Sequence, residues 1–533
     1  MKPLRNGNAV SVVSADAAVQ WIPSGATVAF CGAGGGLLEP TLVIDALVRR
    51  FQHKQEPRSL TYWHSTGLGD RGERGMSPLA LPGLVQRIIG GHWGQSPRLA
   101  EMAERNEIEA YNFPQGVMSQ LLRAAAAGHP GILSHVGLGT FVDPRQKGGK
   151  LNERTREELI QLIEINGLEW LFYPAVRPNV AIIRGTTADT EGYISMEDEI
   201  AYLDALAMAQ ATHNNGGIVI AQVQRLVKAR TLHPKSVKIP GYLVDAVVIH
   251  HEQPQLYTGS VNRYMSGDYV METSEVNPLP LNERKVIARR ALLEVSPGDV
   301  GNVGVGISDG IGVVAREEGV SEEMTLTVET GPIGGVSAQG IFFGASVNMQ
   351  AMLDMPAQFD FYDGGGLDIC FLSFAEADQQ GNVNVHKFNG KIMGTGGFID
   401  ISQNTKKVIF SGALTAGGLK TMILNGEVRI AQEGRFQKLV QQVSEITFNG
   451  MDALRRGQEV MYITERAVFR LTHNGLELAE IAPGLDVERD IISHMGFRPH
   501  ISADMKEMDC RLFLPQTMEI RNEWLKAKRS EEE

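Results

Sequence analysis

Cysteine is scarce in this chain, and the few that occur exclude two kinds of stabilised fold. Cys31, Cys370 and Cys510 are widely separated in 533 residues, and no CxxC pair is present. An odd number of isolated cysteines argues against both a disulfide framework and a zinc cluster. Cys31 and Cys370 stand in apolar, strand-like stretches, so we expect buried and unreactive thiols there.

Long apolar runs are also missing. No stretch of ~18 consecutive apolar residues occurs, so we predict no membrane-spanning segment. The first residues show neither the apolar core nor the small-residue cleavage site of an export signal. With 43% hydrophobic and 21% charged residues, the composition is typical of a soluble globular protein, and we expect it in the cytoplasm.

Positive charge is in deficit. The chain has 50 Lys and Arg against 62 Asp and Glu, a net charge of −12. A nucleic-acid groove needs clustered Lys and Arg, so we predict no nucleic-acid partner. A local basic patch for a phosphorylated ligand stays compatible with this charge. The histidines most suggestive of a metal, at positions 213, 233, 250 and 251, match no compact ligand set, and we predict no metal site.

Glycine, in contrast, is abundant. The chain has 59 glycines, about 11% against a usual ~7%, which indicates many tight turns or close backbone approaches. In residues 26–50 a buried strand runs into Gly32-Ala-Gly-Gly-Gly36 and then into a predicted helix. That order is typical of a phosphate-binding loop, but the GxGxxG spacing is absent. A tight turn without a ligand explains the segment equally well.

The most informative segment is Thr325-Leu-Thr-Val-Glu329-Thr-Gly-Pro-Ile-Gly-Gly335. A short alternating strand ends in a glutamate, and a glycine-rich turn follows at once. Open α/β sheets place their ligands at this carboxyl edge, and glycine backbone lets a substrate approach closely. Glu329 is therefore a candidate nucleophile, although a glutamate at a strand end is more often a surface or capping residue.

Three segments of the first half recur in the same order in the second half, which indicates an internal repeat. Each is a buried strand that breaks into a turn. The pairs are residues 25–34 with 298–306, residues 60–70 with 326–331, and residues 180–192 with 368–381. The second pair places His64 or Ser65 where the later copy has Glu329. We therefore predict an N-terminal domain over residues 1–255, a polar linker over 256–280, and a C-terminal domain over 281–533 that carries Glu329.

Together with Pro114-Gln-Gly116, Gly137-Leu-Gly-Thr140 and Gly394-Thr-Gly-Gly397, these motifs strongly resemble the family I coenzyme A transferases over essentially the whole chain. The resemblance implies an α/β fold of two related open-sheet domains, the CoA-transferase (NagB/RpiA-like) fold, with the active site between them. That agrees with the internal repeat. It also implies an acyl-CoA:carboxylate CoA-transferase acting on short-chain acids such as acetate, propionate and butyrate.

The resemblance implies a ping-pong mechanism. The glutamate at the position of Glu329 attacks the acyl-CoA carbonyl to give an acyl-glutamyl anhydride, and the CoA thiolate then converts it to a glutamyl-CoA thioester. Gln115 would donate its amide to the oxyanions that form, and a backbone N–H at Gly396 or Gly397 would donate a second hydrogen bond. CoA is a substrate that is held covalently in passing, and no permanently bound cofactor is implied.

Seven glycines are candidates for lining the channel of the CoA chain. They are Gly304, Gly306, Gly334, Gly335, Gly364, Gly365 and Gly366. A purely structural role is the competing interpretation for each of them. Lys387, Lys406, Lys407 and Lys420 are candidates for the CoA phosphates, and no motif selects among them.

Two other functions stay open. An acyl-CoA hydrolase would result if water reached the anhydride. A ligand-sensing protein is a further alternative, because related folds serve both isomerases and regulators. The resemblance implies a homodimer or homotetramer, and the periodicity of the sequence does not choose between them.

Overall fold

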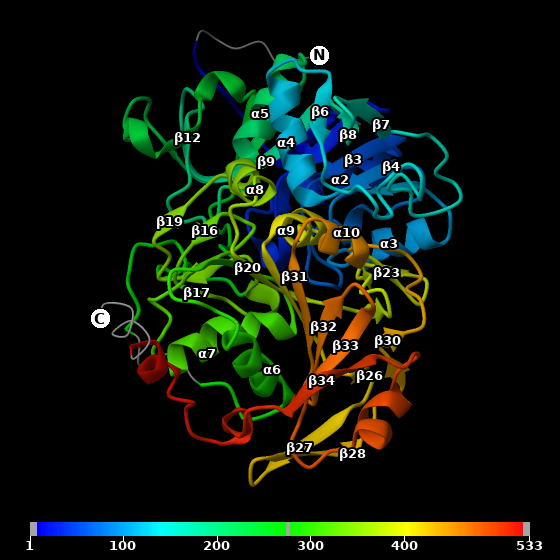
Figure 1. Ribbon diagram of the computed structural model, residues 1–533. Helices are drawn as coiled ribbons and strands as arrows, with labels where there is room; N and C mark the ends of the chain where they lie inside the picture. Colours follow the sequence, from blue (N-terminus) through cyan, green and yellow to red (C-terminus); the bar gives the residue numbers. More distant parts are fainter. Residues whose placement is uncertain (1–7, 273–277, 526–533) are drawn as a thin grey trace.

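The protein is described here from a computed structural model that covers residues 8–272 and 278–525. Two large mixed sheets dominate it, one built from each half of the chain, with helices packed around and between them (Figure 1). The predicted α/β class with two sheet-rich domains is confirmed. In the part of the chain that the structure covers, no helix is both long and apolar enough to cross a bilayer.

The first sheet runs in the order β1-β13-β11-β9-β2-β3-β4-β5, and every neighbouring pair in this row is parallel. Its strands are β1 (Ser11–Val12), β2 (Thr27–Phe30), β3 (Leu60–His64), β4 (Val85–Gly90), β5 (Glu109–Asn112), β9 (Val180–Asp189), β11 (Ile218–Val227) and β13 (Ala246–Ile249), with β10 (Ile194–Ser195) and β12 (Val237–Ile239) at the side. All ten residues of β9 are buried, as expected of a central parallel strand covered on both faces.

The second sheet runs in the order β19-β16-β15-β14-β20-β25-β31-β32-β33-β34. Its strands are β14 (Val300–Val303), β15 (Thr325–Thr327), β16 (Pro332–Ile333), β19 (Ala351–Met352), β20 (Ile369–Ser373), β25 (Lys407–Ser411), β31 (Glu459–Ile463), β32 (Ala467–Thr472), β33 (Gly475–Ile481) and β34 (His500–Glu507). The central five, from β15 to β31, are parallel. Antiparallel pairs extend this sheet on both sides.

Short strands form small separate sheets. In the first half these are β6 (Gly131–Ser134), β7 (Gln161–Ile165) and β8 (Leu168–Pro174). In the second half they are β17 (Val336–Ser337) with β18 (Ser346–Val347), β21 (Glu376–Asp378) with β22 (Val383–Asn384) and β30 (Leu439–Val440), β23 (Lys387–Phe388) with β24 (Lys391–Ile392), β26 (Thr415–Ala416) with β29 (Phe436–Gln437), and β27 (Lys420–Leu424) with β28 (Glu427–Gln432).

The internal repeat is visible in the strand order. The row β13-β11-β9-β2-β3 of the first sheet corresponds to the row β31-β25-β20-β14-β15 of the second. The three sequence pairs fall on β2 with β14, β3 with β15, and β9 with β20. Val28 pairs with both Tyr62 and Val180, and Gly301 pairs with both Leu326 and Ile369. Tyr62 and Leu326 therefore occupy equivalent positions in the two sheets. Ser65 and Glu329 each follow three residues later, so Ser65, rather than His64, is the counterpart of Glu329.

Helices cover the sheets, and one group lies between the two halves. They are α1 (Ala15–Ala18), α2 (Thr41–Lys54), α3 (Pro97–Glu104), α4 (Gln115–Ala126), α5 (Ala205–Asn214), α6 (Glu283–Leu292), α7 (Ile311–Glu317), α8 (Met355–Asp363), α9 (Phe398–Asn404) and α10 (Gly450–Arg455). Helix α4 of the first half packs against α5 and also against α8 and α9 of the second half. The two halves therefore meet through helices at the carboxyl edges of their sheets.

Helix α6 departs from the sequence interpretation. The sequence of this helix, with Lys285, Arg289 and Arg290 on it, favours a solvated cationic face, but all three side chains are buried. Arg290 donates to Glu480 of β33 at 2.8 and 2.9 Å, and Arg289 donates to backbone carbonyls between residues 511 and 516. These hydrogen bonds hold α6 against the second sheet and the C-terminal segment. Long cationic side chains can be buried in this way because their donors have acceptors.

Two further expectations concern the cysteines and the linker. Cys31 and Cys370 are buried, as predicted, and Cys510 is exposed. The start of the predicted linker packs on the first half, where the N–H of Tyr257 donates to the carbonyl of Gly35 at 2.8 Å. Residues 273–277 of the linker lie outside the described part of the chain, and the domain boundaries stay a prediction.

Candidate active site

Glu329 stands just beyond the carboxyl end of a buried parallel strand, as predicted. Strand β15 ends at Thr327, and Val328 and Thr330 on either side of the glutamate are buried. A turn follows at once, in which the N–H of Gly331 donates to the carbonyl of Val328 at 2.9 Å. This is the edge at which open α/β sheets place their ligands, and the turn presents the Glu329 carboxyl to the space between the halves.

Two groups from different halves lie beside the Glu329 carboxyl and lower its pKa by hydrogen bonding. They are the side chain of Gln115, at the start of α4, whose Nε2 also lies 3.4 Å from Met355 Sδ, and the backbone N–H of Gly397, just before α9. The N–H of Gly396 instead donates to the carbonyl of Gly91 at 2.8 Å. Of the two backbone groups that the sequence left open, only that of Gly397 contacts the glutamate in this structure.

The geometry around Gly396 shows how closely the site is assembled. The point where a Cβ atom of residue 396 would stand is 3.4 Å from Gln115 Oε1, 3.8 Å from His92 Cδ2 and 3.9 Å from Glu329 Oε1. Three side chains from distant parts of the sequence therefore converge on one point of backbone. The N–H of Gln115 also donates to the carbonyl of Gly396 at 3.0 Å, which fixes the two loops to each other.

Helix α4, which carries Gln115, is held in place by a carboxylate of the other half. Asp400 on α9 is fully buried, and its Oδ1 accepts from the N–H of Val117 at 3.1 Å in the first turn of α4. Burial, and the nearby charge of Asp363, raise the pKa of Asp400 well above its usual range, so the contact is a hydrogen bond to the helix start and does not depend on a negative charge. The contact fixes the start of α4, and with it Gln115, relative to the second half.

Burial raises the pKa of Glu329 from its ordinary value to about 7, while the hydrogen bonds from Gln115 and Gly397 act in the opposite direction. Enclosure removes water that would stabilise the charged form, and the two donors replace only part of it. The side chain remains partly accessible from the cavity. Near neutral pH the carboxyl is thus divided between its ionised, nucleophilic form and its protonated form.

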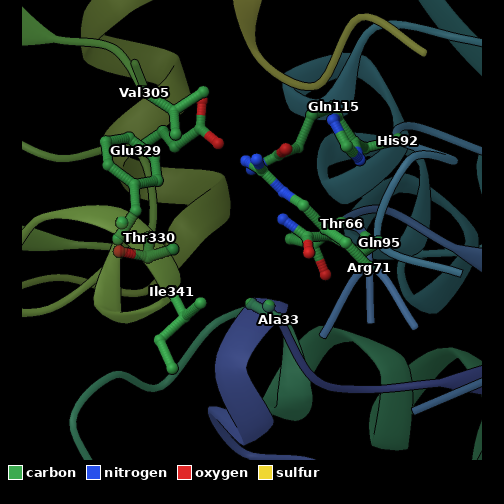
Figure 2. Close-up of a pocket in the computed structure, with 14 residues that line it drawn as sticks. Ala33, Thr66, Arg71, His92, Gln95, Gln115, Val305, Glu329, Thr330 and Ile341 are labelled. Carbon is green, nitrogen blue, oxygen red and sulfur yellow. The ribbon is translucent and has the colours of Figure 1, made fainter. Parts of the chain in front are cut away.

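A small cavity of about 80 Å³ opens beside Glu329 and is walled by both halves (Figure 2). Glu329, Thr330, Val305 and Ile341 face it from one side, and Gln115, His92, Gln95, Thr66 and Arg71 face it from the other. Ala33, Gly34, Gly67, Gly340 and Phe343 complete the lining. The glycine loop at residues 32–36 is therefore part of the site, and its interpretation as a ligand-binding loop gains support.

The loop that corresponds to the Glu329 turn faces it across this cavity. Ser65, the counterpart of Glu329, is buried and donates to Asp204 Oδ2 at 2.7 Å. Its neighbours Thr66 and Gly67 line the cavity, as Thr330 does on the other side. The repeat thus places two related turns opposite each other, and only the second carries an acid.

His92 adds a neutral imidazole to the wall. Burial, and to a lesser extent the nearby charge of Arg71, lowers its pKa to about 4. Its Nδ1 atom is enclosed without a hydrogen-bond partner and faces Gly67, where a Cβ atom would stand 2.7 Å away. At neutral pH this side chain can act as a hydrogen-bond donor or acceptor but not as a charge.

The glycines expected along the CoA channel are not all brought together. Gly304 and Gly306 flank Val305, which lines the cavity. Gly334 and Gly335 form a turn in which their φ angles are both +74°, packed against residues 347–350. Gly364, Gly365 and Gly366 lie at the C-terminal end of α8, outside the cavity beside Glu329.

The four candidate lysines also lie outside the lining of this cavity. Three of them pair with acids: Lys387 with Glu445, Lys406 with Asp368, and Lys407 with Glu294.

Sequence reasoning missed Arg71, His92 and Gln95. Each stands in a loop after β3 or β4, which are neighbouring strands of the first sheet. Thr66 and Gly67 could have been predicted as site residues, because the repeat aligns them with Thr330 and Gly331. His92 and Gln95 follow a strand in His-Trp-Gly-Gln, which has no counterpart in the motifs considered.

With two repeated α/β halves, and a glutamate held between donors from both, the chain belongs to the coenzyme A transferase family, whose model matches residues 12–250. It is an enzyme of this family and has CoA as a substrate. The acetate CoA-transferase YdiF of Escherichia coli (strain K12) is 60% identical over 97% of this chain and 98% of the relative. The caffeate CoA-transferase of Acetobacterium woodii is 43% identical over 94% of this chain and 97% of the relative.

Solved structures agree with the sequence relatives. The apoenzyme of the acyl-CoA transferase YdiF from E. coli O157:H7 superposes with a TM-score of 0.94, at 59% identity, over 97% of this chain and 99% of that one. A thioester complex of the same enzyme with CoA matches equally well.

Proposed function

We propose that this protein transfers CoA between short-chain carboxylic acids, with Glu329 as the group that carries CoA between them. The observation that supports this most strongly is the setting of Glu329, whose carboxyl accepts from Gln115 and Gly397 beside a cavity shared by the two halves. A relative that is 60% identical is named an acetate CoA-transferase, and a neighbouring structure is described as a thioester complex with CoA.

The reaction proceeds in two covalent steps on Glu329. The ionised carboxyl attacks the acyl-CoA carbonyl, the C–S bond breaks, and an acyl-glutamyl anhydride and CoA thiolate result. The thiolate then attacks the glutamyl carbonyl, the acid departs as its carboxylate, and a glutamyl-CoA thioester remains. A second acid reverses both steps and leaves as a new acyl-CoA.

The same donors serve the ground state and the transition states. Each attack makes a tetrahedral oxyanion, and preorganised donors in a site with little water stabilise such charge strongly. When the glutamyl carbonyl is attacked, the oxyanion forms on a Glu329 oxygen, beside the Gln115 side chain and the Gly397 N–H. The small cavity also limits the water that would hydrolyse the anhydride or the thioester.

The size of the cavity supports small acids. A volume of about 80 Å³ suits acetate, propionate or butyrate better than a large aromatic acid. The loop of Gly304, Val305 and Gly306 is the part of the expected CoA channel that lies at the cavity, and we assign the thioester end of CoA to it. We further propose a cytoplasmic homodimer or homotetramer.

A panel of acids offered with acetyl-CoA tests the function. We expect new acyl-CoA esters from propionate and butyrate, little product from bulky aromatic acids, and parallel double-reciprocal plots that indicate a ping-pong mechanism. Free CoA should stay low. Release of free CoA at the same rate with and without an acceptor acid would instead show a hydrolase, and the proposal would have to be abandoned.

A further inference from the structure

Arg71 is a cation at the catalytic cavity that has no partner among the residues the structure describes. Its side chain is exposed and lines the cavity that contains Glu329. Within residues 8–272 and 278–525, no acceptor lies within hydrogen-bonding distance of its guanidinium and no carboxylate within 4.0 Å. Among the described residues that line the cavity it is also the single Lys or Arg, and Glu329 the single acid.

The loop of residues 69–75 holds Arg71 in one direction. The Asp70 carboxylate accepts from the N–H groups of Gly72 and Arg74 at 2.9 and 3.1 Å. The N–H of Arg71 donates to the carbonyl of Gln95 at 3.0 Å. Arg71 has a φ of +63°, a conformation that costs a residue with a side chain and is found where a surrounding structure imposes it.

The neighbouring arginines are engaged elsewhere, which sets Arg71 apart. Arg74 lies 4.9 Å from the centre of the Tyr257 ring, and Arg98 pairs with Glu73 at 2.9 Å. Arg71 instead reaches across the cavity toward the wall that carries Glu329 (Figure 2). A guanidinium left unpaired at the reacting centre is suited to a ligand with a planar anionic group, because its donors match a carboxylate in geometry and charge.

The proposed reaction has one small anionic reactant that must enter this cavity. The glutamyl-CoA thioester is neutral, and the acceptor acid is a carboxylate at neutral pH. The phosphates of CoA are separated from the thioester by the long pantetheine arm, so they do not share a cavity of about 80 Å³ with Glu329. The incoming acid is therefore the anion that Arg71 meets there.

We propose that Arg71 is the receptor for the carboxylate of the acceptor acid, an inference that rests on the proposed function. Bound to Arg71, the acid presents one oxygen to the glutamyl carbonyl. That oxygen forms the new C–O bond, the C–S bond breaks, and CoA leaves as its thiolate. Water is neutral and gains nothing from the guanidinium, so Arg71 also favours transfer over hydrolysis.

Enzyme loaded with CoA on Glu329 allows a direct test. The protein is incubated with acetyl-CoA to completion, freed of small molecules, and exposed either to propionate or to hydroxylamine. Both attack the same thioester, but only propionate is an anion. Loading is run to completion because Arg71 also stabilises the departing acetate, and its loss slows loading by the same interaction.

Three variants are compared. Arg71→Met keeps a long side chain but removes the charge, and Arg71→Lys keeps the charge but removes the planar guanidinium. Arg98→Met is the control for the loss of one nearby positive charge. We expect Arg71→Met to slow the reaction with propionate roughly ten- to a hundredfold and to leave the hydroxylamine reaction unchanged. Arg71→Lys should recover part of the loss, and Arg98→Met should behave as the wild type.

Two results would overturn the assignment. Equal rates with propionate in Arg71→Met and the wild type would show that the acid binds elsewhere. A raised KM for acetyl-CoA, with both nucleophiles reacting normally on the loaded enzyme, would show that Arg71 holds CoA. Failure of the wild type itself to take up CoA on Glu329 is a different outcome, because it would remove the proposed function first.

Discussion

Glu329 has to be ionised to attack a thioester, yet its surroundings favour the protonated form. Burial raises its pKa to about 7, and the Gln115 amide and the Gly397 N–H oppose that rise. The nucleophile is the ionised form, so activity is lost as the pH falls through about 7 and is constant well above it. The same two groups that lower the pKa bind the oxyanion, and their removal should affect both properties.

Replacing Gln115 by alanine tests this double role. Loss of one oxyanion donor should lower kcat by about 10²–10³. Loss of a hydrogen bond to the ionised carboxyl should also move the midpoint of the pH–rate profile to higher pH. Initial rates with acetyl-CoA and propionate from pH 5 to 9 measure both effects. A fall in rate with an unchanged midpoint would show that the amide does not contact Glu329 in the free enzyme.

At this scale the sequence predicted the residues that stand in short motifs. Glu329 could be named because strand, turn and glycine appear together in the chain, whereas Gln115 and the glycines at 396 and 397 were named through the resemblance of their motifs to the CoA-transferase family. Arg71 and His92 could not, because their meaning depends on which loops face the cavity. The sequence could not tell whether Gly396 or Gly397 donates to the oxyanion, because the N–H of Gly396 donates to the carbonyl of Gly91, a contact between distant parts of the chain.

Among the elements, the turn into α9 is shaped by the absence of a side chain. A Cβ atom at residue 397 would stand 2.5 Å from Glu329 Oε2 and 2.9 Å from the Phe359 ring. We expect Gly397→Ala to displace the nucleophile and to lower kcat by at least tenfold, while the protein stays folded.

Gly312→Ala, within α7, is the matched control, because a Cβ atom there makes only ordinary contacts, with Leu326 Cδ1 at 3.5 Å and Val336 Cγ1 at 3.8 Å. It should keep full activity and gain up to about 1 kcal/mol of stability from its helical position. Thermal unfolding and kcat measured on both proteins check this. Full activity of Gly397→Ala would show that the contact with Glu329 is not as close as the structure has it.

Helix α6 depends on a buried ion pair with β33. Arg290 and Glu480 are both buried and joined by two hydrogen bonds of 2.8 and 2.9 Å. Glu480→Leu should destabilise the protein by about 3–5 kcal/mol, because a buried charge loses its main partner. Adding Arg290→Met should restore much of that loss.

The exposed pair of Arg498 with Glu488 provides the control for this experiment. Breaking it with Arg498→Met should cost less than about 1 kcal/mol. Denaturant unfolding of the variants gives the comparison, and similar costs for the two pairs would contradict the importance assigned to the buried one. The sequence favoured a solvated face for the cations of α6, and this was wrong, since periodicity does not reveal which neighbour covers a helix.

At the scale of the whole molecule, each active site is assembled within one chain. Gln115 and Glu329 come from different halves of the same chain, and the N–H of Gln115 donates to Gly396 at 3.0 Å. Mixed oligomers of Gln115→Ala and Glu329→Ala chains should therefore show no recovery of activity beyond that of either variant. Recovery toward half of the wild-type rate would show that neighbouring chains share their sites.

The doubled architecture could be predicted, and its assembly could not. Strand-to-turn transitions recur in the sequence, so the pairing of β2, β3 and β9 with β14, β15 and β20 was accessible. The way the halves meet was not, because it depends on tertiary contacts such as Asp400 at the start of α4. The sequence left His64 and Ser65 as candidates for the counterpart of Glu329, and the register of the strands selects Ser65.

Mass spectrometry of the enzyme after incubation with acetyl-CoA tests the central claim most directly. We expect CoA, joined with loss of water, on the single peptide that contains Glu329, with the label removed by hydroxylamine and absent from Glu329→Ala protein that is still folded. CoA or an acyl group fixed to any other residue, or no label under conditions where acyl transfer proceeds, would contradict the claim that Glu329 carries CoA between acids.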